Sequence, residues 1–452
     1  MLNLGAFVVA ATPPPDARTT AVRAFVDTIG VTLAGAAEPA ARIVQRVVAR
    51  DGAGPCRILG TAQSASVANA ALANGTAAHA HDFDDMCFVS LAHPSAPLVA
   101  AALAAGEVAE APGRALLDAY IVGFEIEGRL GRAMNPRHYQ RGWHCTSTIG
   151  TIGATAAACR LRGLSPSATN HALAIAASEA SGLKENFGSM VKPLHAGLAA
   201  RNAIVAAELA RAGMTASLSA IDGPQGFLAA FDSASVTLDD AMADLGTRWE
   251  ILDTGITVKL YPSCAATHPS LDAMLDLCRA HGVRAEDVAT VTVGVDPITP
   301  TVLLYDAPAN ALEAKFSMPF CIAAAIVDGR VGLDTFDDRR VADPEIATLR
   351  GRVRMTIDPT LDASAPPLTQ ARVTVQLTDG RTLTAAANGA RGYHEQPATD
   401  QELTEKFVAC ASRVLDKDAV QQTLEAIRDL RNIADVNGLT ARSAARGRVS
   451  TP

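Results

Sequence analysis

The chain has 452 residues, of which 49% are hydrophobic, 19% charged and 4% aromatic. This is the composition of a globular protein of about two or three domains, and it excludes a disordered or collagen-like chain. Thirty-nine Lys and Arg against 47 Asp and Glu leave a formal net charge of -8. We therefore expect neither nucleic acid nor an anionic membrane as a partner, and an anionic substrate would need a local cationic pocket.

The cysteine pattern and the N-terminus favour a cytoplasmic protein. Eight cysteines are scattered along the chain without a CxxC pair, which is unlike a disulfide framework or a zinc site. The apolar start has no Lys or Arg before it and runs into Pro13-Pro14-Pro15, so it lacks the charged region of a signal peptide. The apolar runs are interrupted before the ~18 residues that a membrane span requires.

The first part of the chain, from about residue 18 to 260, has a helical pattern. Ala-rich segments at 64–80, 96–111, 148–161 and 195–212 alternate with Gly or Pro, and small residues permit close helix packing. The pattern returns at the end of the chain, where Thr399-Asp400-Gln401-Glu402 predicts a capping box at the start of a helix.

The segment between these helical parts has the pattern of strands. Apolar residues alternate with polar ones at 291–295, 353–357 and 373–377, a period of two. Asp379-Gly380 predicts a type I′ hairpin turn, and one helix is expected at about 317–327. The fold class is therefore mainly α: a large all-helical domain from both chain ends (1–260 and 396–452) with a smaller inserted α+β lid domain (262–394).

A dense polar cluster follows the helix that ends near residue 80. Five of the seven residues from 79 to 85 are titratable, namely His79, His81, Asp82, Asp84 and Asp85, and His93 comes shortly after. One interpretation is a catalytic loop in which a carboxylate orients an imidazole that moves a proton. The alternatives are a helix end with Asp caps and packed histidines, or a metal site, although no HExxH spacing occurs.

Four further polar residues stand in apolar or Gly-rich surroundings: His144, Lys192, His195 and His268. A single buried His is more often a hydrogen-bonded core residue than a catalyst. Lys192 differs, because Pro193 follows it and a helix beginning near Leu194 would present free N–H groups beside its charge. This combination predicts a carboxylate site. The sequence has no GxGxxG, P-loop or GxSxG motif, so the imidazoles, carboxylates and lysines suit proton abstraction next to a carboxylate.

At these residues the sequence resembles the MmgE/PrpD family, which includes 2-methylcitrate dehydratase, cis-aconitate decarboxylase and iminodisuccinate epimerase. The likeness is carried by the segments 81–97, 142–163, 186–213, 259–268 and 314–336. The resemblance implies a homodimer with a helical domain, a smaller lid domain, an active site between them, and no metal or organic cofactor.

The resemblance also implies the site residues. The catalytic set would be Asp82, His93, His144, Lys192 and His268, with substrate contacts from Lys192, His195, Lys259 and Phe320. Three features depart from the named members of the family, one of them a loop from Asp82 to His93 that is one residue longer than in the decarboxylases. Phe320 stands where the decarboxylases have Tyr, and 195–200 differ from the Trp-Ala-Ala-Gly-Asp-Ala of the dehydratases.

The leading hypothesis is an enzyme that abstracts a proton α to a carboxylate on a small di- or tricarboxylic acid, with a 2-methylcitrate dehydratase-like lyase first. An epimerase or isomerase and a cis-aconitate decarboxylase-like lyase are the alternatives within the family. His93 and His144 would be general acid and base, Asp82 would orient an imidazole, and Lys192, His268 and Lys259 would hold carboxylates. Two other classes are a metal-dependent hydrolase built on His79, His81, Asp82 and Asp85, and a non-catalytic binding protein.

Overall fold

The computed structural model describes residues 4–231 and 237–444. Its helices and strands are α1 (Leu4–Ala10), α2 (Pro15–Gly35), α3 (Pro39–Val48), β1 (Cys56–Arg57), β2 (Ser64–Ala65), α4 (Val67–Ala78), α5 (Ser95–Val108), α6 (Gly113–Met134), α7 (Arg137–Gln140), α8 (Cys145–Leu161), α9 (Pro166–Glu179), α10 (Val191–Arg211), α11 (Phe227–Ala230), α12 (Leu238–Ala241), α13 (Glu250–Asp253), α14 (His268–His281), β3 (Val288–Val295), α15 (Ala311–Ala314), α16 (Met318–Asp328), α17 (Asp338–Val341), α18 (Pro344–Arg350), β4 (Val353–Ile357), β5 (Gln370–Leu377), β6 (Thr382–Asn388), α19 (Asp400–Ala411), α20 (Lys417–Arg428) and α21 (Asn437–Arg442). The protein is mainly α with small sheets, as its sequence predicts.

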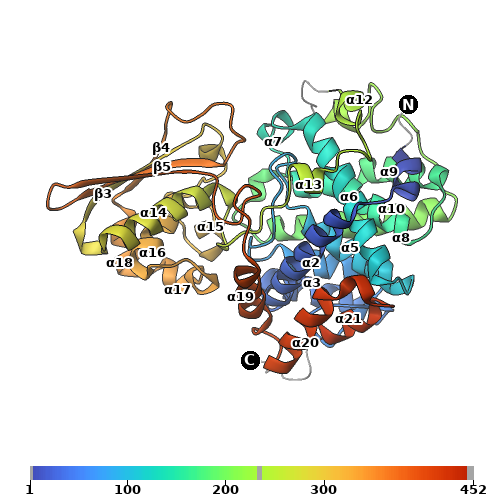
Figure 1. Cartoon of the computed structure of the whole chain (residues 1–452). Coiled ribbons are helices and arrows are strands. Elements are labelled where there is room, and N and C mark those ends of the chain that lie inside the picture. The colour runs from blue at the N-terminus through green and yellow to red at the C-terminus, as the bar shows by residue number, and fades with distance from the viewer. Residues whose placement is uncertain (1–3, 232–236, 445–452) are drawn as a thin grey trace.

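Helices from the two ends of the chain pack together (Figure 1). α19 lies along α2, α20 contacts α2 and α21, and α21 reaches α5. The capping box at the start of α19 is confirmed: Thr399 accepts a hydrogen bond from the Glu402 amide, and the Glu402 carboxylate accepts one from the Thr399 amide. The domain boundaries at 262 and 394 stay a prediction.

Small residues bring two central helices close together. A methyl group at Gly197 of α10 would lie 2.2 Å from Thr76 Oγ1 and 2.4 Å from the Leu72 carbonyl oxygen of α4. Only glycine therefore fits there without a shift of one helix. This contact places the end of α4 beside the beginning of α10, and the polar residues of both segments lie at those ends.

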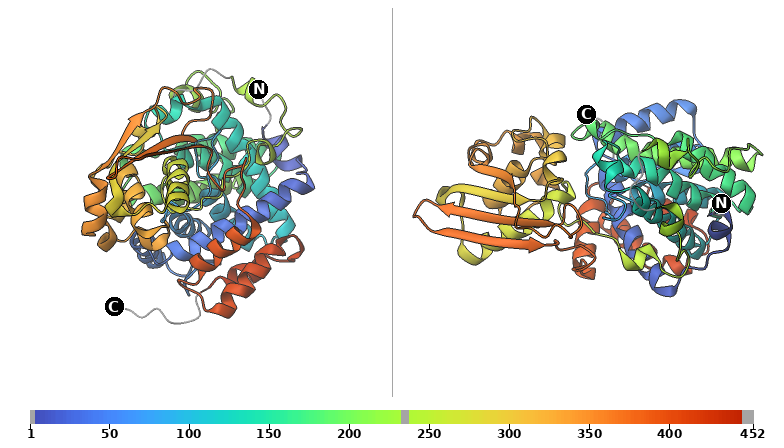
Figure 2. Two further views of the ribbon diagram at one scale, coloured as in Figure 1. Left: turned by 60° about the vertical axis from the view of Figure 1, so that its left-hand side comes forward. Right: turned by 90° about the horizontal axis from the view of Figure 1, so that it is seen from above.

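The second part of the molecule is a four-stranded sheet with helices packed on it. The strand order is β4-β3-β5-β6, with β3 and β4 parallel and the other pairs antiparallel. α14 packs on β5 and β6, and α16 packs on β4. Figure 1 shows these helices on the same side of the sheet, and Figure 2 (right) shows the sheet and its helices beside the helical body.

Three local expectations are corrected. The hairpin turn is not type I′: Gly380 has φ +91° but Asp379 keeps a negative φ, and Leu377 donates to the Arg381 carbonyl at 2.8 Å across a three-residue loop. The strand region contains α14, α15, α17 and α18 besides the expected helix; the apolar Leu271, Met274 and Leu275 of α14 have helical spacing. The helical part also holds the short antiparallel pair β1 and β2.

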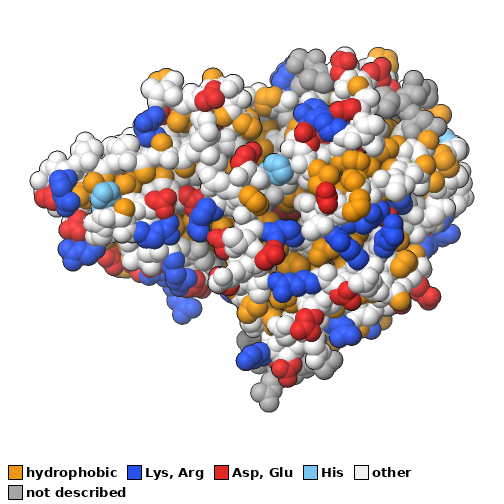
Figure 3. Space-filling view, in the orientation of Figure 1, with side chains coloured by type: hydrophobic (Ala, Val, Ile, Leu, Met, Phe, Trp, Pro, Cys, Tyr) orange, Lys and Arg blue, Asp and Glu red, His pale blue; other side chains and the backbone are white. Residues whose placement is uncertain are grey.

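The surface shows charges of both signs. On the face drawn in Figure 3, basic and acidic side chains are interspersed over both parts of the molecule. Among the described residues, no single helix is long and apolar enough to cross a membrane, and the bent pair Pro15–Gly35 and Pro39–Asp51 meets that criterion only when both helices are counted together.

Candidate active site

The polar loop after α4 lies in the interior of the protein. Asp84 and Asp85 are completely buried, and His79, His81 and Asp82 are at most 5% exposed. Asp82 has φ +52°, a left-handed conformation that non-glycine residues adopt uncommonly. Strained backbone of this kind clusters at functional sites. The loop is therefore no ordinary solvated connection between two helices.

Two lysines hold the Asp82 carboxylate. Lys192 Nζ lies 3.1 Å and Lys259 Nζ 2.7 Å from Asp82 Oδ1. Burial alone would raise the pKa of Asp82, but the two ammonium groups lower it well below its ordinary value. Asp82 is therefore ionised, and its Oδ2 atom has no hydrogen-bond partner among the described residues. One residue from the loop, one from α10 and one from the segment before α14 meet at a single carboxylate oxygen.

His79 links this carboxylate to a second one. Lys192 Nζ donates to His79 Nε2 at 2.8 Å, and His79 Nδ1 lies 2.7 Å from Asp84 Oδ2. Because Nε2 accepts, the proton of a neutral His79 is on Nδ1 and is donated to Asp84. Burial lowers the pKa of His79 to about 4, although Asp84 acts in the opposite direction. The ring is therefore neutral near pH 7.

His93 lies between the Asp82 and Asp84 carboxylates. Its ring packs edge-on against His79 with centroids 4.5 Å apart. His93 Nε2 is 3.5 Å from Asp82 Oδ1, and His93 Nδ1 is 3.4 Å from Asp84 Oδ2, distances that are long for a strong hydrogen bond. Burial lowers the pKa of His93 and the Lys259 charge adds to this. A neutral imidazole without a firm partner can carry a proton to or from a ligand.

His144 and His195 form a separate pair beside this cluster. His144 is the residue before α8 and His195 lies in the second turn of α10. Their Nδ1 atoms are 3.0 Å apart. Burial lowers the pKa of His144 well below its ordinary value and that of His195 to about 4. His144 Nε2 is buried and has no hydrogen-bond partner among the described residues.

The structure places Lys259 and His268 differently from the other predicted residues. Lys259 donates to Asp82 Oδ1, to the Asp82 carbonyl at 2.9 Å and to the Ser263 carbonyl at 2.9 Å, so its three protons are already engaged. His268 Nε2 lies 3.3 Å from the same Ser263 carbonyl, and its ring packs edge-on against Tyr261. Burial lowers the pKa of His268 to about 3. His268 therefore contacts the cluster indirectly, because it and Lys259 both bond the Ser263 carbonyl group.

Phe320 is a core residue, and another phenylalanine lines the site. Phe320 lies in the first turn of α16, is completely buried and packs on Phe336 with centroids 5.8 Å apart. Phe316 instead lines the cavity and lies with Phe187 beside the Lys192 ammonium, whose nitrogen is 5.4 Å and 5.3 Å from the two ring centroids.

A small cavity lies among several of these side chains. It has a volume of about 20 Å³, which is room for one water molecule. Its lining combines the polar cluster with apolar and sulfur-containing side chains: Asp82, Met86, Leu91, His93, Tyr139, His144, Phe187, Lys192, Cys264, Ala265, Phe316 and Leu368. Residues between 82 and 192, from the helical part of the chain, and residues between 264 and 368, from the part that contains the four-stranded sheet, both line the cavity. Charges in such a small buried site interact strongly, because little bulk water screens them.

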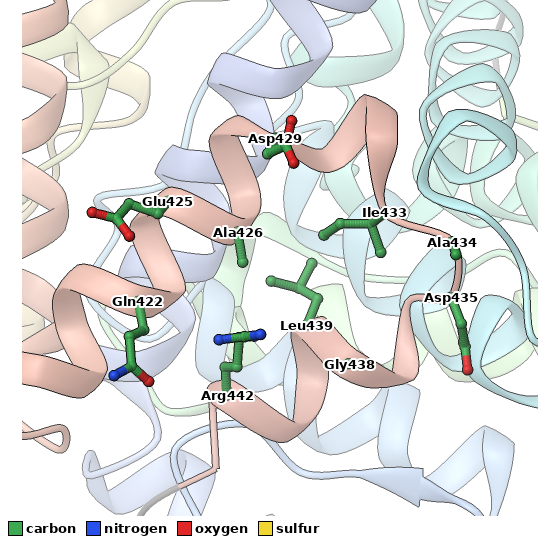
Figure 4. Close-up of a pocket in the computed structure, with 10 residues that line it drawn as sticks. All are labelled: Gln422, Glu425, Ala426, Asp429, Ile433, Ala434, Asp435, Gly438, Leu439 and Arg442. Carbon is green, nitrogen blue, oxygen red and sulfur yellow. The ribbon is translucent and has the colours of Figure 1, made fainter.

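A larger hollow at the surface lacks this chemistry. Figure 4 shows a surface hollow of about 520 Å³ between α20 and α21, where Glu425, Asp429, Asp435 and Arg442 surround apolar side chains. Carboxylates predominate there, so the hollow is unsuited to a carboxylic acid. The buried cavity is therefore the candidate active site.

The carboxylates and histidines also form a possible metal-ligand set. One ligand atom from each of His79, Asp82, Asp84 and His93 lies within 4.8 Å of the others. Lys192, however, already places its ammonium between His79 Nε2 and Asp82 Oδ1, so a divalent ion would have to displace a charged side chain. The set expected for a metal-dependent hydrolase is not assembled: His81 Nε2 lies 3.4 Å from Glu38, and Asp85 binds Ser95.

A mainly helical fold with a buried cluster of lysines, carboxylates and imidazoles indicates an enzyme. Comparison with known proteins gives its family. The chain matches the MmgE/PrpD N-terminal domain over residues 6–237 and the MmgE/PrpD C-terminal domain over residues 261–432. It therefore belongs to the MmgE/PrpD family and is an enzyme of that type.

Three relatives illustrate the likeness. Cis-aconitate decarboxylase of Homo sapiens is 30% identical over 381 residues, which are 82% of this chain and 78% of that protein. Cis-aconitate decarboxylase of Aspergillus terreus is 26% identical over 450 residues, 94% of this chain and 91% of that protein. Cis-aconitate decarboxylase-like protein oryM of Aspergillus oryzae is 28% identical over 455 residues, with 95% and 93% covered.

The structure brings together most of the predicted residues and adds others. Asp82, His93, His144 and Lys192 line one cavity, and His195 and Lys259 contact members of that group. His79 belonged to the predicted polar cluster and to the alternative metal site, but not to the predicted catalytic set. Phe316, Phe187 and Tyr139 were missed, because a single aromatic residue in a sequence does not show whether it faces a core or a cavity.

Proposed function

We propose that the protein is a lyase for a small di- or tricarboxylic acid, and that decarboxylation of a cis-aconitate-like acid is its first candidate reaction. The observation that carries this proposal is the Lys192–Asp82–Lys259 cluster beside the unpartnered His144 Nε2 in a closed cavity. The names of the relatives favour decarboxylation over dehydration, which the sequence analysis placed first.

The chemistry of these groups suits a carbanion intermediate. Loss of carbon dioxide, or removal of an α-proton, leaves an electron pair on a carbon next to a carboxylate, and the charge spreads onto oxygen. A fixed cation stabilises that charge most where water is excluded, and a nearby imidazole can deliver or take the proton. Lys192 is the cation that lines the cavity.

Each residue receives a role from its contacts. Lys192 binds a substrate carboxylate, and His93 and His144 are the proton carriers, since their neutral rings line the cavity. Asp82 positions Lys192 and His93. Lys259 positions Asp82 rather than holding substrate directly, because its protons are already donated.

Three of the predicted residues act at most from behind the cavity. His195 supports His144 through their Nδ1 contact. His268 acts through the Ser263 carbonyl that it shares with Lys259. Phe320 supports the aromatic packing behind the site. None of these three side chains is assigned a direct contact with substrate.

Dehydration and epimerisation stay alternatives at the same site. Both need a base at the α-carbon and a cation at the carboxylate, and the cavity offers both. We further propose that the enzyme works without a metal or organic cofactor, as a cytoplasmic homodimer. Light scattering of the purified protein checks the oligomeric state.

Proton NMR in D2O tests the proposed reaction. The EDTA-treated enzyme is incubated with cis-aconitate, citrate, 2-methylcitrate and iminodisuccinate. A decarboxylase converts cis-aconitate to a product that lacks one carboxyl group and carries deuterium at the carbon that is protonated. A new vinylic signal from citrate or 2-methylcitrate indicates a dehydratase instead, and α-deuterium in an unchanged skeleton indicates an epimerase.

The same experiment tests the metal alternative. If every acid is unchanged and activity on a phosphoester appears on addition of a divalent metal, the lyase proposal is wrong. The His79, Asp82, Asp84 and His93 set would then be the metal site, with Lys192 displaced.

A further inference from the structure

The contact between His144 and His195 constrains where their protons are. Two imidazoles whose Nδ1 atoms are 3.0 Å apart need one proton between them: two bare lone pairs repel each other, and two N–H groups cannot both point into the gap. One ring therefore donates from Nδ1 and the other accepts.

The tautomer of this pair decides what His144 presents to the cavity. If His144 Nδ1 accepts the shared proton, a neutral His144 carries its own proton on Nε2, and this atom is a donor. If His144 Nδ1 donates, Nε2 is bare and can accept. Nε2 is the atom that has no partner among the described residues, and the His144 ring lines the cavity. The tautomer of His144 therefore decides whether this residue acts as an acid or as a base.

The surroundings of His144 work against a charged ring. Its ring stacks on that of His79 at 5.5 Å and lies edge-on to Phe187 at 4.9 Å, and both burial and the charge of Lys192 lower its pKa. A neutral imidazole is a weak acid unless its second nitrogen gains a proton as the first one loses its own. His195 is in position to supply that proton.

On the basis of the proposed lyase function, we propose that His195 is a positioning residue that relays a proton to His144. The electron pair on the substrate carbon forms a C–H bond with the proton of His144 Nε2, whose N–H bond breaks. At the same time the Nδ1–H bond of His195 breaks and an Nδ1–H bond forms on His144. Water gives a proton to His195 Nε2 and is left as hydroxide, so both rings end neutral.

The order of the two rings follows from their exposure. Both residues are buried, but His195, 4% exposed, is less deeply buried than His144, 1% exposed, and the relay therefore takes His195 as the ring nearer to solvent. The backbone fixes the pair: the His144 amide donates to the Gly182 carbonyl at 3.0 Å, and Ser147 Oγ donates to the His195 carbonyl at 3.3 Å.

Two substitutions of His195 separate relay from packing. His195→Asn keeps a hydrogen-bonding group near the Nδ1 position but cannot pass a proton through a ring, and His195→Phe removes both properties. His171→Asn is the matched control, since this half-buried histidine of α9 bonds the Ala216 carbonyl instead. Each protein is assayed for kcat and KM, and kcat is measured across mixtures of H2O and D2O.

The relay predicts that both His195 variants lose at least about 100-fold in kcat, the lower end for general acid catalysis, while KM changes less than about threefold. The dependence of kcat on the D2O fraction should be curved in the native enzyme, because more than one proton moves, and should become linear in His195→Asn. The proposal is wrong if His195→Asn keeps kcat and the curvature.

A measurement without turnover separates this proposal from the proposed function. In nitrogen-15 NMR of the histidine-labelled protein, we expect one protonated and one bare Nδ1 in the pair, assigned with the His144→Phe and His195→Phe variants. Two bare Nδ1 atoms overturn the relay. If the native enzyme converts none of the acids, the proposed lyase function fails, whatever the tautomers are.

Discussion

At the scale of single residues, the site depends on charges that compensate each other in the absence of water. Asp82 is ionised because Lys192 and Lys259 hold it, and the imidazoles around it are neutral because burial disfavours their charge. A substrate carboxylate can compete with Asp82 for Lys192, which lines the cavity. It cannot do so for Lys259 without breaking at least one of the three hydrogen bonds that this lysine already donates.

Replacing Lys192 tests this division of roles. Lys192→Met should lower kcat/KM at least about 100-fold, because the substrate charge loses its cation in a water-excluded site, while circular dichroism shows an unchanged fold. Lys417→Met, an exposed lysine at the start of α20, is the control and should keep the native rate. Equal rates for both variants would remove Lys192 from the site.

At the scale of elements, the contact between α4 and α10 sets the geometry of the cluster. Gly197 lets these helices approach so closely that the loop after α4 reaches Lys192. The sequence showed both helices and the polar residues at their ends. The pairing of the two helices is a tertiary contact, and the glycine alone did not reveal its partner.

A methyl group at this contact should therefore be damaging. Gly197→Ala is expected to lower the free energy of unfolding by about 1–3 kcal/mol, as overpacking does, and to lower kcat because Lys192 moves away from Asp82. Gly438→Ala in α21 is the control: a Cβ there meets no atom within 4 Å, so stability should be unchanged or slightly higher. Urea unfolding and initial rates measure both effects.

Helix α6, which packs against α8, carries a buried carboxyl group that has no hydrogen-bond partner among the described residues. Neither carboxyl oxygen of Glu127 has a hydrogen-bond partner among the described residues, and burial raises the pKa of Glu127 well above its ordinary value of 4.5. The folded protein therefore holds Glu127 protonated, whereas the unfolded chain ionises it above pH 4.5. Its contribution to stability is lost progressively as the pH rises from there.

Removing this group should remove that pH dependence. Glu127→Met is expected to be more stable than the native protein at pH 8, and the difference should grow between pH 5 and pH 8 by up to about 1.4 kcal/mol per pH unit. Denaturant unfolding at several pH values measures it, with the exposed Glu345→Met as control. A difference that is constant with pH would mean that Glu127 is ionised in the folded state.

At the scale of the whole molecule, the cavity must open before a substrate binds. Its volume of about 20 Å³ holds one water molecule, far less than a tricarboxylic acid needs. Phe187 borders both this cavity and a surface groove whose lining includes Lys184 and Leu304. Tyr305 Oη donates to the Phe187 carbonyl at 2.8 Å and so joins the two parts of the molecule at this point.

Hydrogen exchange should locate that opening. Saturation with a non-reactive tricarboxylate is expected to slow amide exchange at 183–188 and 297–305, because the bound acid holds the groove closed over the cavity, and to leave β4 unchanged. Calorimetry confirms saturation. Unchanged exchange in both segments at saturation would place the route to the cavity elsewhere.

The sequence by itself determined the mainly helical fold, the strand segments, the capping box of α19 and the family, because each depends on local periodicity or on motifs that are read along the chain. It also indicated Asp82, His93, His144 and Lys192, since clustered polar residues in apolar surroundings are visible in one dimension.

Only the tertiary structure decided which atoms meet. It set His195 against His144, gave Lys259 to Asp82, placed His79 between Lys192 and Asp84, and put Phe316 rather than Phe320 at the cavity. Apart from that of His79 with Asp84, the polar contacts named here join residues more than 50 positions apart, and side-chain direction and close packing determine them. No local pattern in the sequence specifies the direction of a side chain or the packing around it.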